Sequence, residues 1–98
     1  MMLTLQECID LCDLTEEEVE AIAEHEHIPM IVAAELGNYL VHSPDGIPKI
    51  RAFIADDIKA AAARGDKAHV RLLKLVLWHF IQTHPETQQK AAAANANP

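Results

Sequence analysis

The chain of 98 residues carries 15 Asp and Glu against 8 Lys and Arg, a formal charge of −7 at pH 7. This balance argues against sequence-independent nucleic-acid binding, which relies on basic side chains neutralising phosphates, and against adsorption to an anionic membrane surface. The length allows one small domain. Half of the residues are apolar but only 4% are aromatic, so its core must be built from Ile, Leu, Val and Ala.

Two features of the N-terminal region favour a cytoplasmic location. Its first residues, Met-Met-Leu-Thr-Leu-Gln-Glu, lack the basic segment and apolar run of a secretory signal. Cys8 and Cys12 are four residues apart on an expected helix, which is poor geometry for a disulfide within the chain. Two unpaired thiols are typical of a reducing compartment.

Two capping boxes predict the first two helices. Thr4-Leu-Gln-Glu7 and Thr15-Glu-Glu-Glu18 each place Thr three residues before Glu, so that each side chain bonds the other residue's backbone amide. A helix of about two turns follows the first box. The second helix begins at Glu16 and should end near His27, because Pro29 disfavours helical geometry at the residue before it.

The most apolar stretch, residues 29–42, predicts a central helix. At 100° per residue, all polar side chains of this stretch fall on one narrow strip, and the rest of the circumference is apolar, small or aromatic. The strip consists of Ile31, Glu35, Asn38 and His42. Helices of this kind are normally buried on several sides. We therefore expect the other helices to pack around this one.

Two more helices, joined by a short turn, follow the turn cluster that ends at Gly46. The first begins after Asp45, a candidate N-cap, and points an inward stripe at the core: Ile47, Ile50, Ile54, Ile58 and Ala61. Gly65 suits the left-handed position after this helix, and Asp66 suits the N-cap of the next. So short a connection predicts an antiparallel hairpin.

The last helix, about Lys67 to Thr83, should bury five apolar side chains: Val70, Leu73, Leu77, Phe80 and Ile81. The Ala-, Asn- and Gln-rich residues 86–98 offer little to anchor them, so we expect a flexible tail. The predicted fold is therefore all-α. It is a compact bundle or orthogonal array of four main helices plus a short N-terminal helix, forming one domain over residues 1–85.

One candidate site is a metal centre. Glu24 and His27 have the Glu-x-x-His spacing that ferritin-like di-iron proteins use on two helices. Glu20 shares their face, and Glu35 on the next helix is a fourth candidate ligand for iron, zinc or manganese. The chain holds no second Glu-x-x-His, so a homodimer would have to complete the site. The alternative interpretation is a set of exposed polar side chains at the end of an acidic helix.

The remaining titratable residues favour structural roles. Asp57 lies beside the inward stripe, where a charge is costly unless paired, and we expect Arg51 or Arg64 to pair with it. His69 and His84 project inward on the last helix, and histidines at a core edge usually find a backbone partner. The sequence offers no nucleophile and base that can be placed together, which argues against an enzyme.

A second apolar patch on the last helix predicts an interface. Trp78 projects next to Arg71, away from the buried stripe, with Leu75 and His79 nearby. Either the N-terminal helix covers this patch, or it meets a partner, most economically a second copy in a symmetric dimer. The sequence therefore predicts a small acidic cytoplasmic interaction or regulatory module that self-associates. The alternative is a metal- or cofactor-binding helical protein.

Overall fold

The computed structural model describes residues 4–11 and 13–84, so the expected tail at 86–98 lies outside the described residues. These residues form five helices and no strand: α1 (Leu5–Leu11), α2 (Glu16–Glu26), α3 (Met30–Val41), α4 (Gly46–Ala63) and α5 (Lys67–Thr83). The predicted all-α fold of four main helices and a short N-terminal one is confirmed.

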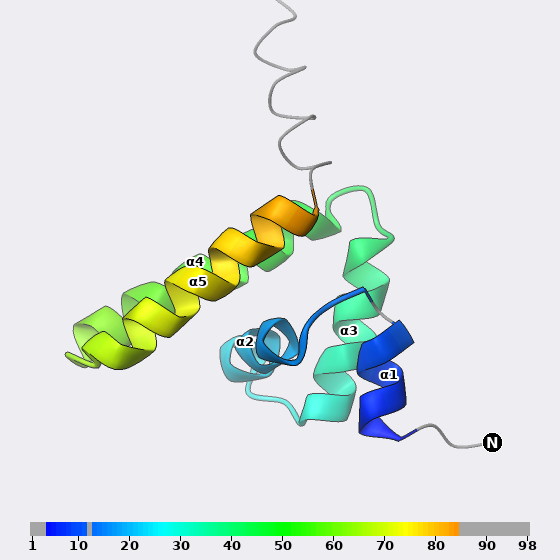
Figure 1. The fold of residues 1–98 in the computed structure, drawn as a ribbon, viewed down its shortest axis with the longest axis horizontal. Helices are drawn as coiled ribbons and strands as arrows, with labels where there is room; N and C mark the ends of the chain where they lie inside the picture. Colours follow the sequence, from blue (N-terminus) through cyan, green and yellow to red (C-terminus); the bar gives the residue numbers. More distant parts are fainter. Residues whose placement is uncertain (1–3, 12, 85–98) are drawn as a thin grey trace, which may run out of the picture.

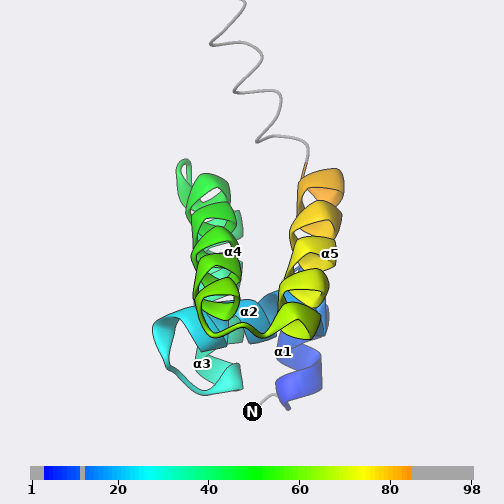
Figure 2. The ribbon, with the colours of Figure 1, turned by 90° about the vertical axis from the view of Figure 1, so that its left-hand side faces the viewer.

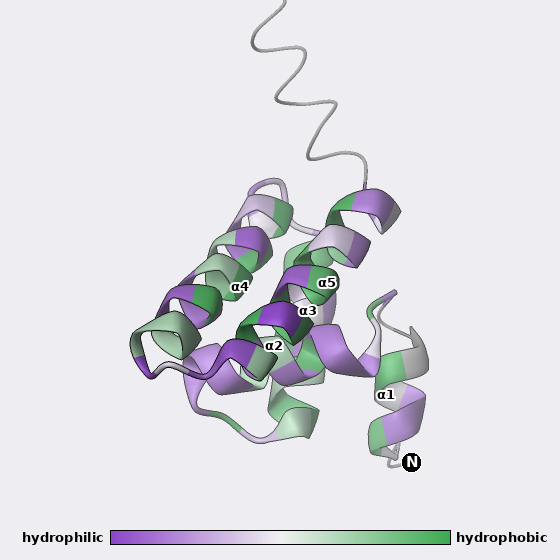
Figure 3. Ribbon diagram, turned by 60° about the vertical axis from the view of Figure 1, so that its left-hand side comes forward, coloured by the Kyte–Doolittle hydropathy of each residue, from purple (hydrophilic) through white to green (hydrophobic). Residues whose placement is uncertain are grey.

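The helices form a compact array around the long α4–α5 hairpin. These two helices stand side by side, and α2 crosses the hairpin with His25 against Phe53 and Asp56, in the middle of α4 (Figures 1 and 2). In addition to both hairpin helices, α2 contacts α3, whereas α1 packs on α3 at the far side of the molecule. In the view coloured by hydropathy, hydrophobic and hydrophilic residues alternate around α4 and α5 (Figure 3). One side of each helix can therefore face the core.

Most helix ends follow the expected capping chemistry. In the second box, the Thr15 amide donates to Glu18 Oε1 at 2.9 Å and the Glu18 amide donates to Thr15 Oγ1 at 3.1 Å. The first box has the same two hydrogen bonds. Asp66 accepts a hydrogen bond from a backbone amide of α5, and Gly65 has a φ of 75°. Asp45 occupies the N-cap position of α4 as predicted, but its side chain accepts no hydrogen bond from an amide of that helix.

The core lies where α2, α4 and α5 meet. The largest fully buried side chains are Val19, Ile22, Ile50, Ile54 and Phe80, together with the acidic Glu18. The predicted stripe of α4 is largely confirmed, because its Ile and Ala positions are buried or half-buried. On α5, the structure adds Val76 to the expected set of buried residues.

The expectation that other helices pack around residues 29–42 is confirmed in part, since α3 contacts α1, α2 and α4, but α3 is less covered than its apolar composition predicts. One broad side of α3 is exposed and includes Val32 at 43% and Tyr39 at 70% exposure. The buried side carries the small residues Ala33, Ala34 and Gly37. A Cβ on Gly37 would lie 2.5 Å from Leu14 Cδ1, so close packing on this side depends on the missing side chain. Apolar composition alone therefore overestimated how much of α3 its neighbours cover.

Candidate functional site

The most exposed apolar residues of α5 form one continuous surface. Leu72, Leu75 and Trp78 are 47%, 66% and 62% exposed. We call this surface, with the neighbouring polar side chains, the α5 face; it consists of Arg71, Leu72, Lys74, Leu75, Trp78 and His79. Since α1 packs on α3, the N-terminal helix does not cover Trp78.

The helical repeat separates this face from the core. Leu73, Val76 and Phe80 are buried on the opposite side of α5, where α2 and α4 cover them. Ala68, Leu72, Leu75 and His79 follow one another at intervals of four, three and four residues. That spacing keeps side chains on one stripe of a helix and is the spacing of a coiled-coil seam. The exposed stripe can therefore face another helix along its length.

A cavity of about 290 Å³ lies between α2 and α5, next to the α5 face. Its lining combines three carboxylates and one imidazole with an apolar wall: Glu17, Glu20, Glu24 and His69, with Ala21, Met30, Leu72, Leu73 and Val76. Leu72 belongs both to this lining and to the α5 face. Because no Lys or Arg lines the cavity, its charged side chains favour a cationic group.

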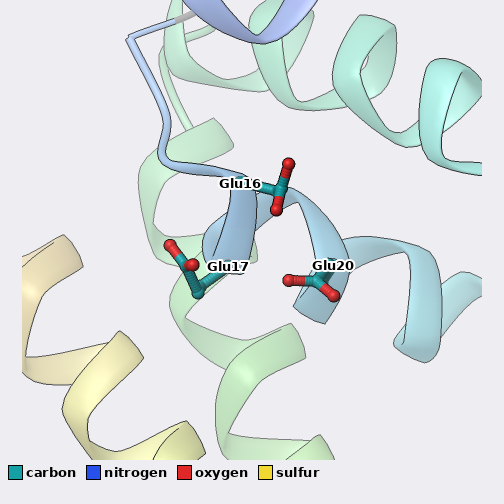
Figure 4. A group of neighbouring side chains, drawn as sticks. All are labelled: Glu16, Glu17 and Glu20. Carbon is teal, nitrogen blue, oxygen red and sulfur yellow. The ribbon is translucent and has the colours of Figure 1, made fainter. Parts of the chain in front are cut away.

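The rim of this cavity is part of an acidic cluster at the start of α2. One oxygen each of Glu16, Glu17 and Glu20 lies within 4.8 Å of the other two, and all three residues are exposed (Figure 4). Acidic residues are favoured at this end of a helix by the macrodipole. The helix dipole therefore accounts for the acidic cluster, and the cluster is not by itself a metal site.

Histidine–carboxylate pairs connect α2 to the hairpin. His79 Nδ1 lies 2.9 Å from Oε2 of the buried Glu18, and His69 Nε2 lies 2.7 Å from Glu24 Oε1. These pairs bind α2 to α5 at two points along its length. The prediction that His69 takes a backbone partner is therefore wrong, whereas His84 does take one, at Phe80 O.

His25 forms the corresponding contact with α4. Its Nε2 lies 3.0 Å from Asp56 Oδ2 and its Nδ1 lies 2.8 Å from Glu26 Oε2, while its ring stacks on Phe53 at 4.3 Å. Partial burial alone would lower the pKa of His25, but the two carboxylate hydrogen bonds together with the charge of Asp57 raise it. The protonated imidazole is therefore the form that this position favours.

Asp57 is buried in α4 with its Oδ2 unpaired, so the predicted pairing with Arg51 or Arg64 is wrong. Burial and then the charge of Glu24 raise its pKa to about 7, although His25 and His69 oppose the shift. Helix projection found the inward position of Asp57 but could not identify neighbours on other helices. Those neighbours are acids and imidazoles rather than arginines.

Of the four predicted metal ligands, Glu20 and Glu24 line the same cavity, whereas His27 and Glu35 do not. Glu20 belongs to the acidic cluster, Glu24 contacts His69, and Glu35 is exposed on α3. His27 follows the end of α2 with a φ of 57°, so it leaves the helical register that the Glu-x-x-His spacing assumes. Within residues 4–11 and 13–84, these four residues do not bring three ligand atoms within 4.8 Å of one another.

Sequence reasoning gave no site role to Glu18, Asp57 or His69. Glu18 was identified only as a capping residue, and nothing in its local sequence indicates that its second carboxylate oxygen binds His79. For Asp57 and His69, the available signal was that helix projection places each of these polar residues on the inward side of its helix. This signal could have suggested a polar contact in the core, but it gave no partner.

Comparison with known proteins identifies no relative: no family model, curated protein or solved structure matches the chain. No helix in the described part of the chain combines the length and the apolar character needed to cross a membrane.

Proposed function

We propose that this protein is a small interaction module that self-associates through the α5 face. The observation that carries the proposal is the exposure of Leu72, Leu75 and Trp78 on one side of a well-packed helix. Exposed apolar residues that form one continuous surface mark interaction sites more often than isolated ones do. Trp and Arg are also the residue types that most often dominate binding energy, and Arg71 lies beside Trp78 on the helix projection.

A second copy is the partner that the charges favour. The chain is acidic overall, yet the α5 face carries Arg71 and Lys74, both exposed. The acidic cluster and the cavity carboxylates of a second copy offer opposite charges to these cations. Burying a large side chain such as Trp or Leu contributes about 1.5–3 kcal/mol each, which is opposed by the lost freedom of the two molecules.

Light scattering after size exclusion tests this function. The wild-type protein should have twice the mass of one chain, and Trp78→Ala should lower that mass toward the monomer. The variant should keep its helical circular dichroism, because Trp78 is not part of the core. Tyr39→Ala is a matched control, since Tyr39 is an equally exposed aromatic residue on α3; it should leave the mass unchanged. A wild-type protein that stays monomeric up to high micromolar concentration would refute self-association.

Metal binding is the second candidate function, and the contact between Glu24 and His69 favours it. Carboxylate and imidazole are ligands for zinc, iron and manganese, and Glu20 lines the same cavity. In this candidate site, the imidazole ligand is His69 rather than His27, which the sequence had suggested. Protein purified without chelator should then contain one of these metals, and Glu24→Ala should remove it. Folded protein that is free of metal and unchanged by added ions would exclude this function.

A further inference from the structure

The α5 face has opposite charges on its two flanks. On the helix projection, Leu75 and Leu72 lie between Arg71 and Lys74 on one side and the cavity on the other. The cavity side presents Glu17 and Glu20 from α2. One flank of the apolar stripe is therefore basic and the other is acidic.

Both flanks lie at the same height along α5, and neither is neutralised within the chain. Arg71 and Lys74 occupy the same turns as Leu72, Leu73 and Val76, which line the cavity. In the part of the chain that the structure describes, every ion pair within 4 Å joins a histidine to a carboxylate. The two basic residues and the two rim glutamates are in none of them. Their charges are therefore available to a partner.

Two-fold symmetry then decides how two α5 faces can meet. If the axis runs along the helices, the two copies of α5 are parallel, and the acidic flank of each lies against the basic flank of the other. If the axis runs across the helices, they are antiparallel, and each flank meets its own copy. Like charges placed opposite each other across an interface disfavour association. The parallel arrangement is therefore favoured.

We infer that two copies pair with their α5 helices parallel, so that Arg71 and Lys74 of each copy bind Glu17 and Glu20 at the rim of the other copy's cavity. This inference rests on the proposed self-association and adds its geometry. The spacing of Ala68, Leu72, Leu75 and His79 agrees with it, since parallel coiled coils alternate intervals of three and four residues. Trp78 then packs at the level of His79 of the second copy.

Charge reversal tests whether the basic flank of one copy binds the acidic flank of the other. The double variant Arg71→Glu with Lys74→Glu should raise the dimer dissociation constant about tenfold or more, and so should Glu17→Lys with Glu20→Lys. An equimolar mixture of the two double variants should recover the mass of a dimer, because each copy then offers the other opposite charges on both flanks. An unfolded variant could not recover in this way. Lys49→Glu with Arg51→Glu is the control, since it makes the same change of net charge on α4.

Cross-linking tests the orientation. In the parallel arrangement, residue 82 lies close to residue 82 of the second copy, so Gln82→Cys should form a covalent dimer under mild oxidation. In an antiparallel pair centred on Leu75, residue 82 would meet residue 68, about 21 Å from its own copy. Ala68→Cys should give the same result as Gln82→Cys. Wild-type protein treated with the same oxidant controls for Cys8 and Cys12.

The outcomes separate the inference from the proposed function. A monomeric wild-type protein refutes both. A dimer that keeps its affinity after charge reversal, or that forms no additional cross-link through residue 68 or 82, refutes the parallel arrangement and leaves self-association intact. Recovery of the dimer in the mixture, together with both cross-links, supports the inference.

Discussion

The buried Asp57 predicts that the protein loses stability as the pH rises from about 4 to about 7. Burial and the neighbouring Glu24 raise the pKa of Asp57 from 3.8 in the unfolded chain to about 7 in the folded protein. Between these values the folded state binds the extra proton, so raising the pH disfavours folding. We therefore expect Asp57→Asn, which cannot ionise, to become more stable than the wild type as the pH rises.

The size of this effect follows from the shift. Where folded Asp57 is protonated and unfolded Asp57 is ionised, each pH unit removes about 1.4 kcal/mol from the free energy of unfolding. From pH 5 to pH 7, the stability of Asp57→Asn relative to the wild type should therefore increase by about 2–3 kcal/mol. The difference should level off above pH 7, where both states of Asp57 become ionised. The buried amide of Asn adds a cost of its own, but that cost does not change with pH.

Urea unfolding of both proteins at pH 5, 6, 7 and 8, followed by circular dichroism, measures this difference. Asp45→Asn is the control, because it replaces an exposed carboxyl at the N-cap position of the same helix and leaves Asp57 in place. That variant should keep the wild-type loss of stability between pH 5 and pH 7. A difference between Asp57→Asn and the wild type that stays constant from pH 5 to pH 8 would refute the reasoning.

Three further substitutions test the fold through urea or thermal unfolding. Thr15→Ala removes the capping side chain of α2 and should cost about 1 kcal/mol; no loss would mean that the capping box is not stabilising. Gly46→Ala should destabilise more than Gly65→Ala, because a Cβ on Gly46 would lie 1.6 Å from the carbonyl oxygen of Leu40, whereas Gly65 faces open space and costs only about 1–2 kcal/mol through its positive φ. Phe80→Ala should cost about 3–5 kcal/mol, and a loss below 1 kcal/mol would place Phe80 outside the core.

The helices could be predicted from the sequence because their signals are local. Capping boxes, the Gly65–Asp66 turn and the apolar repeat of α4 each act within a few residues, and the structure reproduces them. The burial of α3 could not be predicted in this way. Whether Val32 and Tyr39 are covered depends on where the other helices pack, and an apolar residue on a helix does not specify its neighbour.

The difference between local signals and tertiary packing also explains which parts of the candidate site could be predicted. The outward position of Trp78 follows from the helical period, so the sequence could identify it. The partners of Glu24 and Asp57 lie on other helices, and only tertiary packing brings His69 toward them. The Glu24–His27 spacing failed as a guide because it assumes a continuous helix. The chain leaves helical geometry at His27, one residue after α2 ends.

The two sides of α5 allow folding and assembly to be altered separately. Its inward side supplies Leu73, Val76 and Phe80 to a core that is already closed by α2 and α4. Leu75 and Trp78 take no part in that closure, because most of their surface is exposed. His79 belongs to both sides, since it lies on the exposed side but binds the buried Glu18. Substitutions at Leu75 and Trp78 should therefore change association alone. Substitutions at His79 should change association and the docking of α2 together.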